Sequence, residues 1–320
     1  MFPVLFVVLI SLVQQDSLDF YIQRGLDASY CEDYDSAKFY INKAIEIDTN
    51  NPLGYFAYTG LFRIYTSDFV TDSLLDSFFY YADKTVEKTN LRIKKNKNDG
   101  WGYFFLGAIN MYISSLYVEK GNYLKSLSFA EKSVNEIRLC LARNPDLYDA
   151  YLVMGSYEYL KGSFPLWSAY KDKGIEKIRI ASRMSTYSRH MAKNILAILL
   201  QREGRYDESL KVAKELVDAF PQSRTFRWTL CKTYLAKGEW DEAIESYKYL
   251  LQNIMKEQPD NSYNIIQVEL SLANAYYNKG EFDKAIELCN DIFNRDSSDK
   301  KVRKMIKEAK EIYKNAMRNH

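Results

Sequence analysis

The chain has 320 residues, of which 47% are hydrophobic, and its 44 basic and 42 acidic residues leave a net charge of +2. This near balance gives no reason to expect a nucleic-acid partner, because nucleic-acid-binding domains carry an excess of Lys and Arg. The two histidines, His190 and His320, cannot form an HExxH zinc motif and are a poor basis for a catalytic triad. We therefore predict no catalytic residue, no metal site and no cofactor, and a protein that is not an enzyme.

Residues 1–13 form an apolar run, MFPVLFVVLISLV, which is followed by Gln14-Gln15-Asp16. The run is shorter than the roughly 20 residues that span a bilayer. It fits the apolar core of a secretory signal peptide, although no basic residue precedes it and no Ala-x-Ala site follows. We predict a signal peptide over residues 1–15 and an exported protein of the periplasm or cell envelope. The alternative is an uncleaved N-terminal anchor, and we expect membrane association only through this segment.

Residues 16–51 are predicted to form a first helical hairpin. Small residues stand at Gly25, Ala37 and Ala44, and the aromatic Tyr34 follows the turn. At the turn, Glu32 stands where later turns of the chain have glycine. Because glycine is the residue that most readily ends a helix in a left-handed conformation, we expect this helix end to be less sharply terminated.

Residues 52–187 keep a helical pattern without a regular period, and we predict long helices over 53–66, 71–97 and 101–119. The second of these ends in the basic residues Arg92, Lys94, Lys95 and Lys97. Cations at the C-terminus of a helix complement its dipole, so we interpret them as a solvated helix end rather than a phosphate site. An alternative function stays open for this section, a small-molecule or glycan site, perhaps hydrolytic, built from its aromatic residues.

The stretch Gly-Ser-Phe-Pro-Leu-Trp, which ends at Trp167, interrupts the middle section. If they are exposed, its aromatic residues Phe164 and Trp167 are candidates for a ligand or partner patch. If they are buried, they plug an irregular unit of the fold. Loops rich in aromatic residues usually turn the rings inward, so we favour the plug.

Residues 188–299 repeat one pattern three times: glycine, any residue, an aromatic residue, two polar residues and a small residue. The pattern starts at Gly204, Gly238 and Gly280. The first interval is 34 residues (238 − 204), the period of a helix–turn–helix repeat, in which glycine ends the first helix with a positive φ. The second interval is 42 residues (280 − 238), and we assign the eight extra residues to a loop over 255–263, which contains Pro259.

Small residues recur at fixed distances from these turns. On the first helices they are Ala197, Cys231 and Ala273, and on two of the second helices they are Ala243 and Ala285. Together with the aromatic residue after each turn, this arrangement resembles the tetratricopeptide repeat (TPR) family, and the middle section resembles uncharacterised bacterial TPR proteins. The resemblance implies an all-α solenoid, a right-handed superhelix of helical hairpins with an irregular middle section, and a non-catalytic scaffold for protein–protein interaction.

In a TPR superhelix the first helix of each pair lines a concave groove, so the resemblance also implies where a partner binds. The candidate groove residues combine amides, two cations and aromatic rings: Asn194, Arg202, Trp228, Lys232, Asn274, Tyr277 and Asn278. They suit a partner protein or an extended peptide that packs on Trp228 and Tyr277, unless Trp228 only fills the interior. In the first repeat the groove places hold Ile22, Leu26 and Tyr30. These lack the Lys/Asn/Arg clamp with which one TPR subgroup binds chaperone C-termini.

Residues 300–320 are predicted to form an amphipathic helix that caps the array. Val302, Met305 and Ala309 begin an apolar face at helical spacing, and Lys and Glu cover the opposite face. A repeat array needs such a terminal element with a polar outer face for solubility. This role accounts for both faces of the helix.

Overall fold

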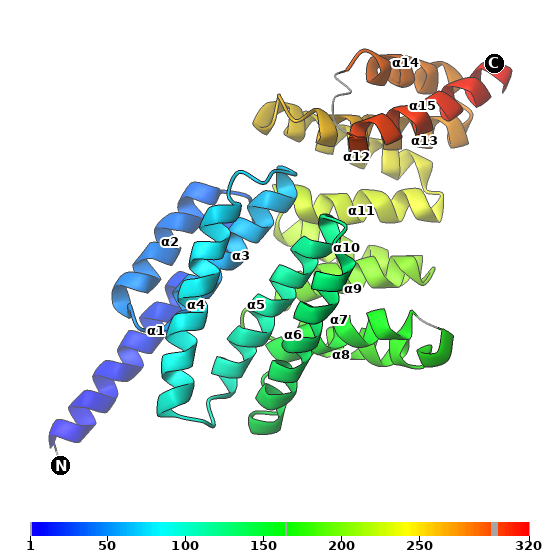
Figure 1. The fold of residues 1–320 in the computed structure, drawn as a ribbon. Coiled ribbons are helices and arrows are strands. Elements are labelled where there is room, and N and C mark those ends of the chain that lie inside the picture. The colour runs from blue at the N-terminus through cyan, green and yellow to red at the C-terminus, as the bar shows by residue number, and fades with distance from the viewer. Residues whose placement is uncertain (1, 164, 296–299, 320) are drawn as a thin grey trace. The chain divides into compact units, whose positions relative to one another are not determined.

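The computed structural model describes residues 2–163, 165–295 and 300–319, with side chains from Gln15 onward and, in the last segment, from Lys301. Within these residues the chain forms fifteen α-helices and one short 3₁₀ helix, η1 (Pro165–Trp167), and no strand (Figure 1). The prediction of an all-α fold is confirmed.

The chain divides into two compact units. The first comprises Met1–Ser67 and Asp72–Leu196, and the second comprises Ala197–His320 together with the short segment Asp68–Thr71. The first unit contains η1 and the helices α1 (Phe2–Tyr30), α2 (Tyr34–Ile47), α3 (Pro52–Asp68, of which Asp68 belongs to the second unit), α4 (Leu75–Lys95), α5 (Gly100–Glu119), α6 (Tyr123–Arg143), α7 (Asp149–Gly162) and α8 (Tyr170–Met184). The second contains α10 (Tyr206–Ala219), α11 (Arg224–Lys237), α12 (Trp240–Glu257), α13 (Ser262–Lys279), α14 (Phe282–Phe293) and α15 (Lys300–Asn319), while α9 (Arg189–Arg202) has residues in both.

The three predicted repeats form the hairpins α9–α10, α11–α12 and α13–α14. Gly204, Gly238 and Gly280 have φ angles of 74°, 84° and 85°, the left-handed conformation that ends a helix. The small residues at the helix crossings are fully buried: Ala197, Ser209, Cys231, Ala243, Ala273 and Ala285. They let the paired helices approach closely. The terminal helix α15 packs on α13 and α14 and buries Val302, Met305 and Ala309, as its pattern predicts.

The eight extra residues between the second and third repeats do not form a long loop. Helices α12 and α13 have 18 residues each, whereas α10 and α11 have 14. The predicted loop over 255–263 is therefore wrong, because α12 continues to Glu257 and α13 begins at Ser262. The insertion adds about one turn to each of the two helices, and only residues 258–261, with Pro259, connect them.

The first turn of the chain is built like the glycine turns. Glu32 has a φ of 62°, in the left-handed region. The Asp33 N–H donates to the Ala28 carbonyl at 3.0 Å, as the Glu239 N–H donates to the Tyr234 carbonyl at 3.1 Å. The expectation of a less sharply terminated helix at Glu32 is therefore wrong, since these hydrogen bonds outweigh the cost of about 1–2 kcal/mol for a left-handed non-glycine residue.

Helix α1 includes residues 2–15, the predicted signal peptide, and runs without interruption to Tyr30. None of the helices, as far as their residues are described, is long and apolar enough to cross a membrane. Cleavage and export stay predictions.

The first helices of the first unit meet around an aromatic core. Phe104 and Phe105 of α5 are buried in it, and Trp101 lies 5.4 Å, ring to ring, from Tyr187. Ile22 and Tyr30, which the repeat register places in a groove, are also buried. These two expectations are wrong, because Ile22 belongs to this core and the Tyr30 ring packs edge-on against His190 at 5.7 Å.

The connection between α8 and α9 closes this core. The carboxylate of Asp149, itself buried, accepts hydrogen bonds from the backbone N–H groups of Thr186, Tyr187 and Ser188 at 2.8, 3.0 and 2.8 Å. The Tyr187 hydroxyl donates in turn to Asp19 of α1 at 2.6 Å. The start of the first unit is thereby bonded directly to its end.

Candidate functional site

We call the surface formed by Ala197–Arg202, α11 and α13 the first-helix face of the second unit. Six of the seven predicted groove residues lie on its helices. Arg202, Lys232 and Asn278 are exposed, and Trp228, Asn274 and Tyr277 are partly buried. Asn194 does not belong to this face, because it is buried and lies in the first unit. Its assignment to the groove is wrong.

Trp228 has both a buried and an accessible side. Its ring lies 6.1 Å from the ring of Tyr247, which is fully buried on α12. The ammonium group of Lys232 lies 5.1 Å from the Trp228 ring centroid, a cation–π contact. Trp228 therefore fills part of the interior and keeps part of its side chain accessible, and its role in partner binding stays a prediction.

The positive charge of this face is concentrated at Lys232 and Arg202. The pKa of Lys232 lies below its usual value because surrounding protein atoms desolvate the ammonium group and because the Arg202 guanidinium repels it. The side-chain amide of Gln201 donates to the Lys232 backbone carbonyl at 2.8 Å and fixes the spacing of α9 and α11. An anionic group at this position would relieve the repulsion between the two cations.

The third repeat contributes polar groups. The Asn278 amide donates to the side-chain oxygen of Asn274 at 2.6 Å and to its backbone carbonyl at 2.8 Å. The Tyr277 ring lies 5.7 Å from the ring of Phe282, so one side of it packs on α14. The Asn274 amide nitrogen and the Asn278 side-chain oxygen keep the donor and acceptor capacity that a peptide backbone needs.

The second unit holds a peptide segment of this chain. Asp68 and Arg224 form an ion pair whose side chains are only 2% and 6% exposed, with Arg224 Nε donating to Asp68 Oδ1 at 2.9 Å. The amide of Asn264 donates to the Asp68 carbonyl at 2.6 Å, and that of Asn261 donates to the Phe69 carbonyl at 2.9 Å. Asp68–Phe69 is thus bound through its carboxylate and through two backbone carbonyls.

The connection between the two lengthened helices, with the first turn of α13, supplies this binding site. Asn261 lies directly before α13 and Asn264 in its first turn, and Gln258, directly after α12, accepts from both of their amides at 2.8 Å. All three residues lie in or beside the eight-residue insertion. Sequence reasoning missed this site, since the insertion alone does not reveal which distant residue it holds. The one available signal was its Gln-Pro-Asp-Asn composition.

The segment around η1 does not plug the fold. Leu166 and Trp167 are both exposed, and the Lys161 ammonium group lies 5.6 Å from the Trp167 ring centroid. The favoured interpretation of this loop is therefore wrong for the part that the structure describes. Phe164 lies outside the described residues. Trp167 stays a candidate for a partner patch.

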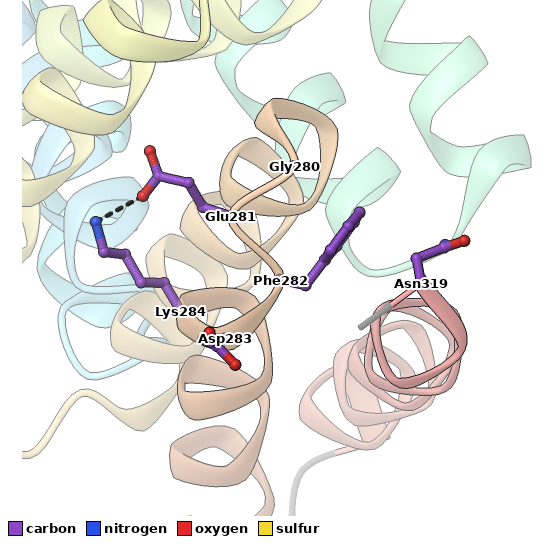
Figure 2. Close-up of a pocket in the computed structure, with 6 residues that line it drawn as sticks. All are labelled: Gly280, Glu281, Phe282, Asp283, Lys284 and Asn319. Carbon is purple, nitrogen blue, oxygen red and sulfur yellow. Dashed lines mark hydrogen bonds and ion pairs between the residues drawn. The ribbon is translucent and has the colours of Figure 1, made fainter.

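A hollow of about 340 Å³ lies between the start of α14 and the end of α15 (Figure 2). Glu281 in this hollow is paired with Lys279 and Lys284. Their hydrogen bonds to its carboxylate lower the pKa of Glu281 to about 2. Figure 2 shows that Phe282 points toward the side where Asn319 lies and away from this ion pair. The hollow contains no predicted site residue and offers no unpaired charge to a ligand.

A second hollow of about 300 Å³ is lined by Lys88, Arg92 and Lys95 of α4 with residues of the connection before α3. Arg92 is already bound, as its Nε and Nη2 donate to the Asp99 carboxylate at 2.7 and 3.0 Å. Arg92 is thus occupied by Asp99, and the interpretation of Lys94, Lys95 and Lys97 as a solvated helix end stays a prediction. In the described part of the chain, no three His, Cys, Asp or Glu residues are grouped so that they could hold a metal ion.

Comparisons with known proteins agree with this architecture. Family models described as tetratricopeptide repeat match residues 18–51 and 196–262. No curated protein matches the sequence. Among solved structures, the chain is similar to PilW, a type IV pilus biogenesis factor (15% identity, 71% of this chain and 91% of that chain, TM-score 0.51). It is also similar to a chain of the APC/C hetero-tetramer Cut9–Hcn1 (14%, 93% and 54%, TM-score 0.55) and to a TPR protein from Parabacteroides merdae ATCC 43184 (17%, 92% and 99%, TM-score 0.40).

Proposed function

We propose that this protein, a solenoid of tetratricopeptide repeats, is a scaffold that binds a partner protein through an extended segment laid on the first-helix face of its second unit. The observation that carries the proposal is the pairing of Trp228 with Lys232, on a face that also carries the exposed Arg202. A half-buried aromatic ring beside a cation is a favourable contact for an aromatic or aliphatic side chain followed by a carboxylate. Repeat proteins use extended surfaces of this kind for binding.

The amide groups of Asn274 and Asn278 support the backbone part of the proposal. The second unit already holds Asp68–Phe69 by the same chemistry, with amides on carbonyls and a guanidinium on a carboxylate. The bound segment is expected to be acidic, because Lys232 and Arg202 are exposed cations on this face. The alternative site in the aromatic middle section has no specific observation in its favour, since Phe104 and Phe105 are core residues.

A peptide selection on the full-length chain tests this function. We expect 12-residue phage-display peptides selected on the protein to be enriched in acidic and aromatic residues. A selected peptide should bind at least tenfold more weakly to Trp228→Ala and Lys232→Glu in fluorescence anisotropy. Lys211→Glu is the matched control, because Lys211 is an exposed lysine on α10. Equal affinity for all three variants, each shown to be folded by circular dichroism, would exclude the first-helix face as the binding site.

We also propose that the protein is exported, with residues 1–15 acting as a signal peptide. The apolar run of residues 1–13 supports this proposal. Mass spectrometry of the protein from its host should find a mature chain that begins near Gln14–Ser17. An intact Met1 would contradict export by cleavage.

A further inference from the structure

The turn between α5 and α6 in the first unit exposes large apolar side chains. Leu124 is 83% exposed and Leu127 is 66% exposed, and Val118 and Tyr123 beside them are exposed too. Contiguous exposed apolar residues on a soluble protein mark interaction sites. No part of the first-helix face of the second unit is involved, so this surface needs its own explanation.

A comparison with the repeats of the second unit shows which helix would cover this surface. Gly121 to Leu127 follows the same pattern as Gly204 to Leu210 and Gly238 to Ile244. The fifth residue of the second helix is only 5% and 7% exposed at Leu210 and Ile244, where α11 and α13 pack on α10 and α12. Leu127 is the same fifth residue of α6, and it is 66% exposed because no first helix in the described part of the chain covers it.

The lengths of the helices explain why Leu127 is uncovered. Helices α5 and α6 have 20 and 21 residues, whereas the next hairpin, α7–α8, has 14 and 15. The difference of six or seven residues corresponds to about 10 Å of helix. Farther along α6, Val134 and Ile137 are buried, so α6 is covered in that half and its first two turns project.

Ion pairs position the end of α5, which borders the projecting turns of α6. Arg63 of α3 forms an ion pair with Glu119, and Lys120 forms one with Asp72 at 3.3 Å. These contacts hold the end of α5 against its neighbours in the first unit. The apolar side of α6 is thereby presented in a defined position, as a binding surface requires.

Lys125 and Lys132 are two cations of this surface and outnumber the exposed Glu131 beside them. The Lys125 ammonium group lies 5.3 Å from the ring of Tyr117, and that of Lys132 lies 5.0 Å from the ring of Phe129. The two rings stack on each other at 5.6 Å. The structure describes no ion pair to either lysine. The surface therefore combines an apolar centre with a basic edge, which is complementary to a partner with acidic residues.

We propose that the first two turns of α6, with the end of α5, dock an amphipathic helix of a partner protein that has acidic residues along the edge of its apolar face. This helix takes the place that the first helix of the next repeat takes on α10 and α12. Its apolar residues at positions i, i+3 and i+4 cover Leu124 and Leu127. Its carboxylates lie against Lys125, within these two turns, and against Lys132 in the next turn of α6.

Site-specific photo-cross-linking of the full chain in its host tests the proposal. Leu124 is replaced by p-benzoylphenylalanine, and Asp207, the same position of α10, serves as the matched control site. We expect an adduct at position 124 only, mapped by mass spectrometry to a helical segment with an apolar face and acidic residues. An adduct to lipid, to a second copy of this chain or to a segment without that pattern would overturn the proposal, as would no adduct above the control.

A synthetic peptide of the mapped segment then measures the contact. We expect its affinity in fluorescence anisotropy to fall at least tenfold for Leu127→Asp, which adds a negative charge to the apolar centre. Circular dichroism should show an unchanged melting temperature for this variant because Leu127 is exposed. An unchanged affinity would overturn the proposal, whereas Trp228→Ala should have no effect on this peptide.

Discussion

The two units use the same helical hairpin, yet their first helices differ in what they present. In the first unit they carry Phe104 and Phe105, which are buried in one aromatic core, and Tyr30, which is buried as well. In the second unit they carry Lys232 and Asn278, both exposed. The comparison teaches that the turns set the hairpin, whereas the residues along the first helix decide whether its inner side becomes core or binding surface. Burial of aromatic area drives the first outcome.

The largest expected effect distinguishes the closed aromatic core of the first unit from the first-helix face of the second unit. Phe104→Ala should lower the free energy of unfolding by about 3–5 kcal/mol, because it leaves a cavity in the closed core. Trp228→Ala should cost about 1 kcal/mol, since only one side of that ring is packed. Urea denaturation of both variants measures the difference. Equal losses would mean that Trp228 is core and that both units are closed.

A smaller effect is expected at the segment held by the second unit. Asp68→Ala should lower the free energy of unfolding by about 3 kcal/mol, because it leaves the buried Arg224 guanidinium without its partner. Asp72→Ala is the matched control, since Asp72 forms an exposed pair with Lys120 and should cost less than about 1 kcal/mol. If both variants melt alike, Asp68–Thr71 does not complete the second unit.

The smallest expected effect is an increase in the free energy of unfolding, whereas the two preceding substitutions lower it. Leu124→Asp should raise the free energy of unfolding by about 0.5 kcal/mol, because an acidic residue in the first turn of a helix interacts favourably with the helix dipole. Asp207, Asp241 and Asp283 occupy the same place in the second unit. Thermal unfolding of the full chain measures the change. A loss above about 1 kcal/mol would show that Leu124 is packed within its own unit.

The local pattern predicted the hairpins well because their causes are local. Gly238 ends a helix by its own conformation, and Ala243 is small at the residue where two consecutive helices cross. The pattern could not predict that Asn264 binds the carbonyl of Asp68, since the sequence around each residue does not indicate which distant residue it contacts. It also placed Asn194 in the groove, because helical register gives a direction from the axis but not the neighbour that covers it. The exposure of Trp167 was missed because its burial was expected from a general tendency of aromatic residues in loops, and not from any neighbour that covers this ring.

The segment Asp68–Thr71 has a consequence for how the protein is made. Asp68 precedes Asn264, which binds its carbonyl, by 196 residues. At a synthesis rate of about 5–20 residues per second, Asp68 leaves the ribosome roughly ten to forty seconds before Asn264. The second unit can therefore complete its fold only after nearly the whole chain has been translated. A fragment that starts at residue 197 would lack a carboxylate that its arginine needs.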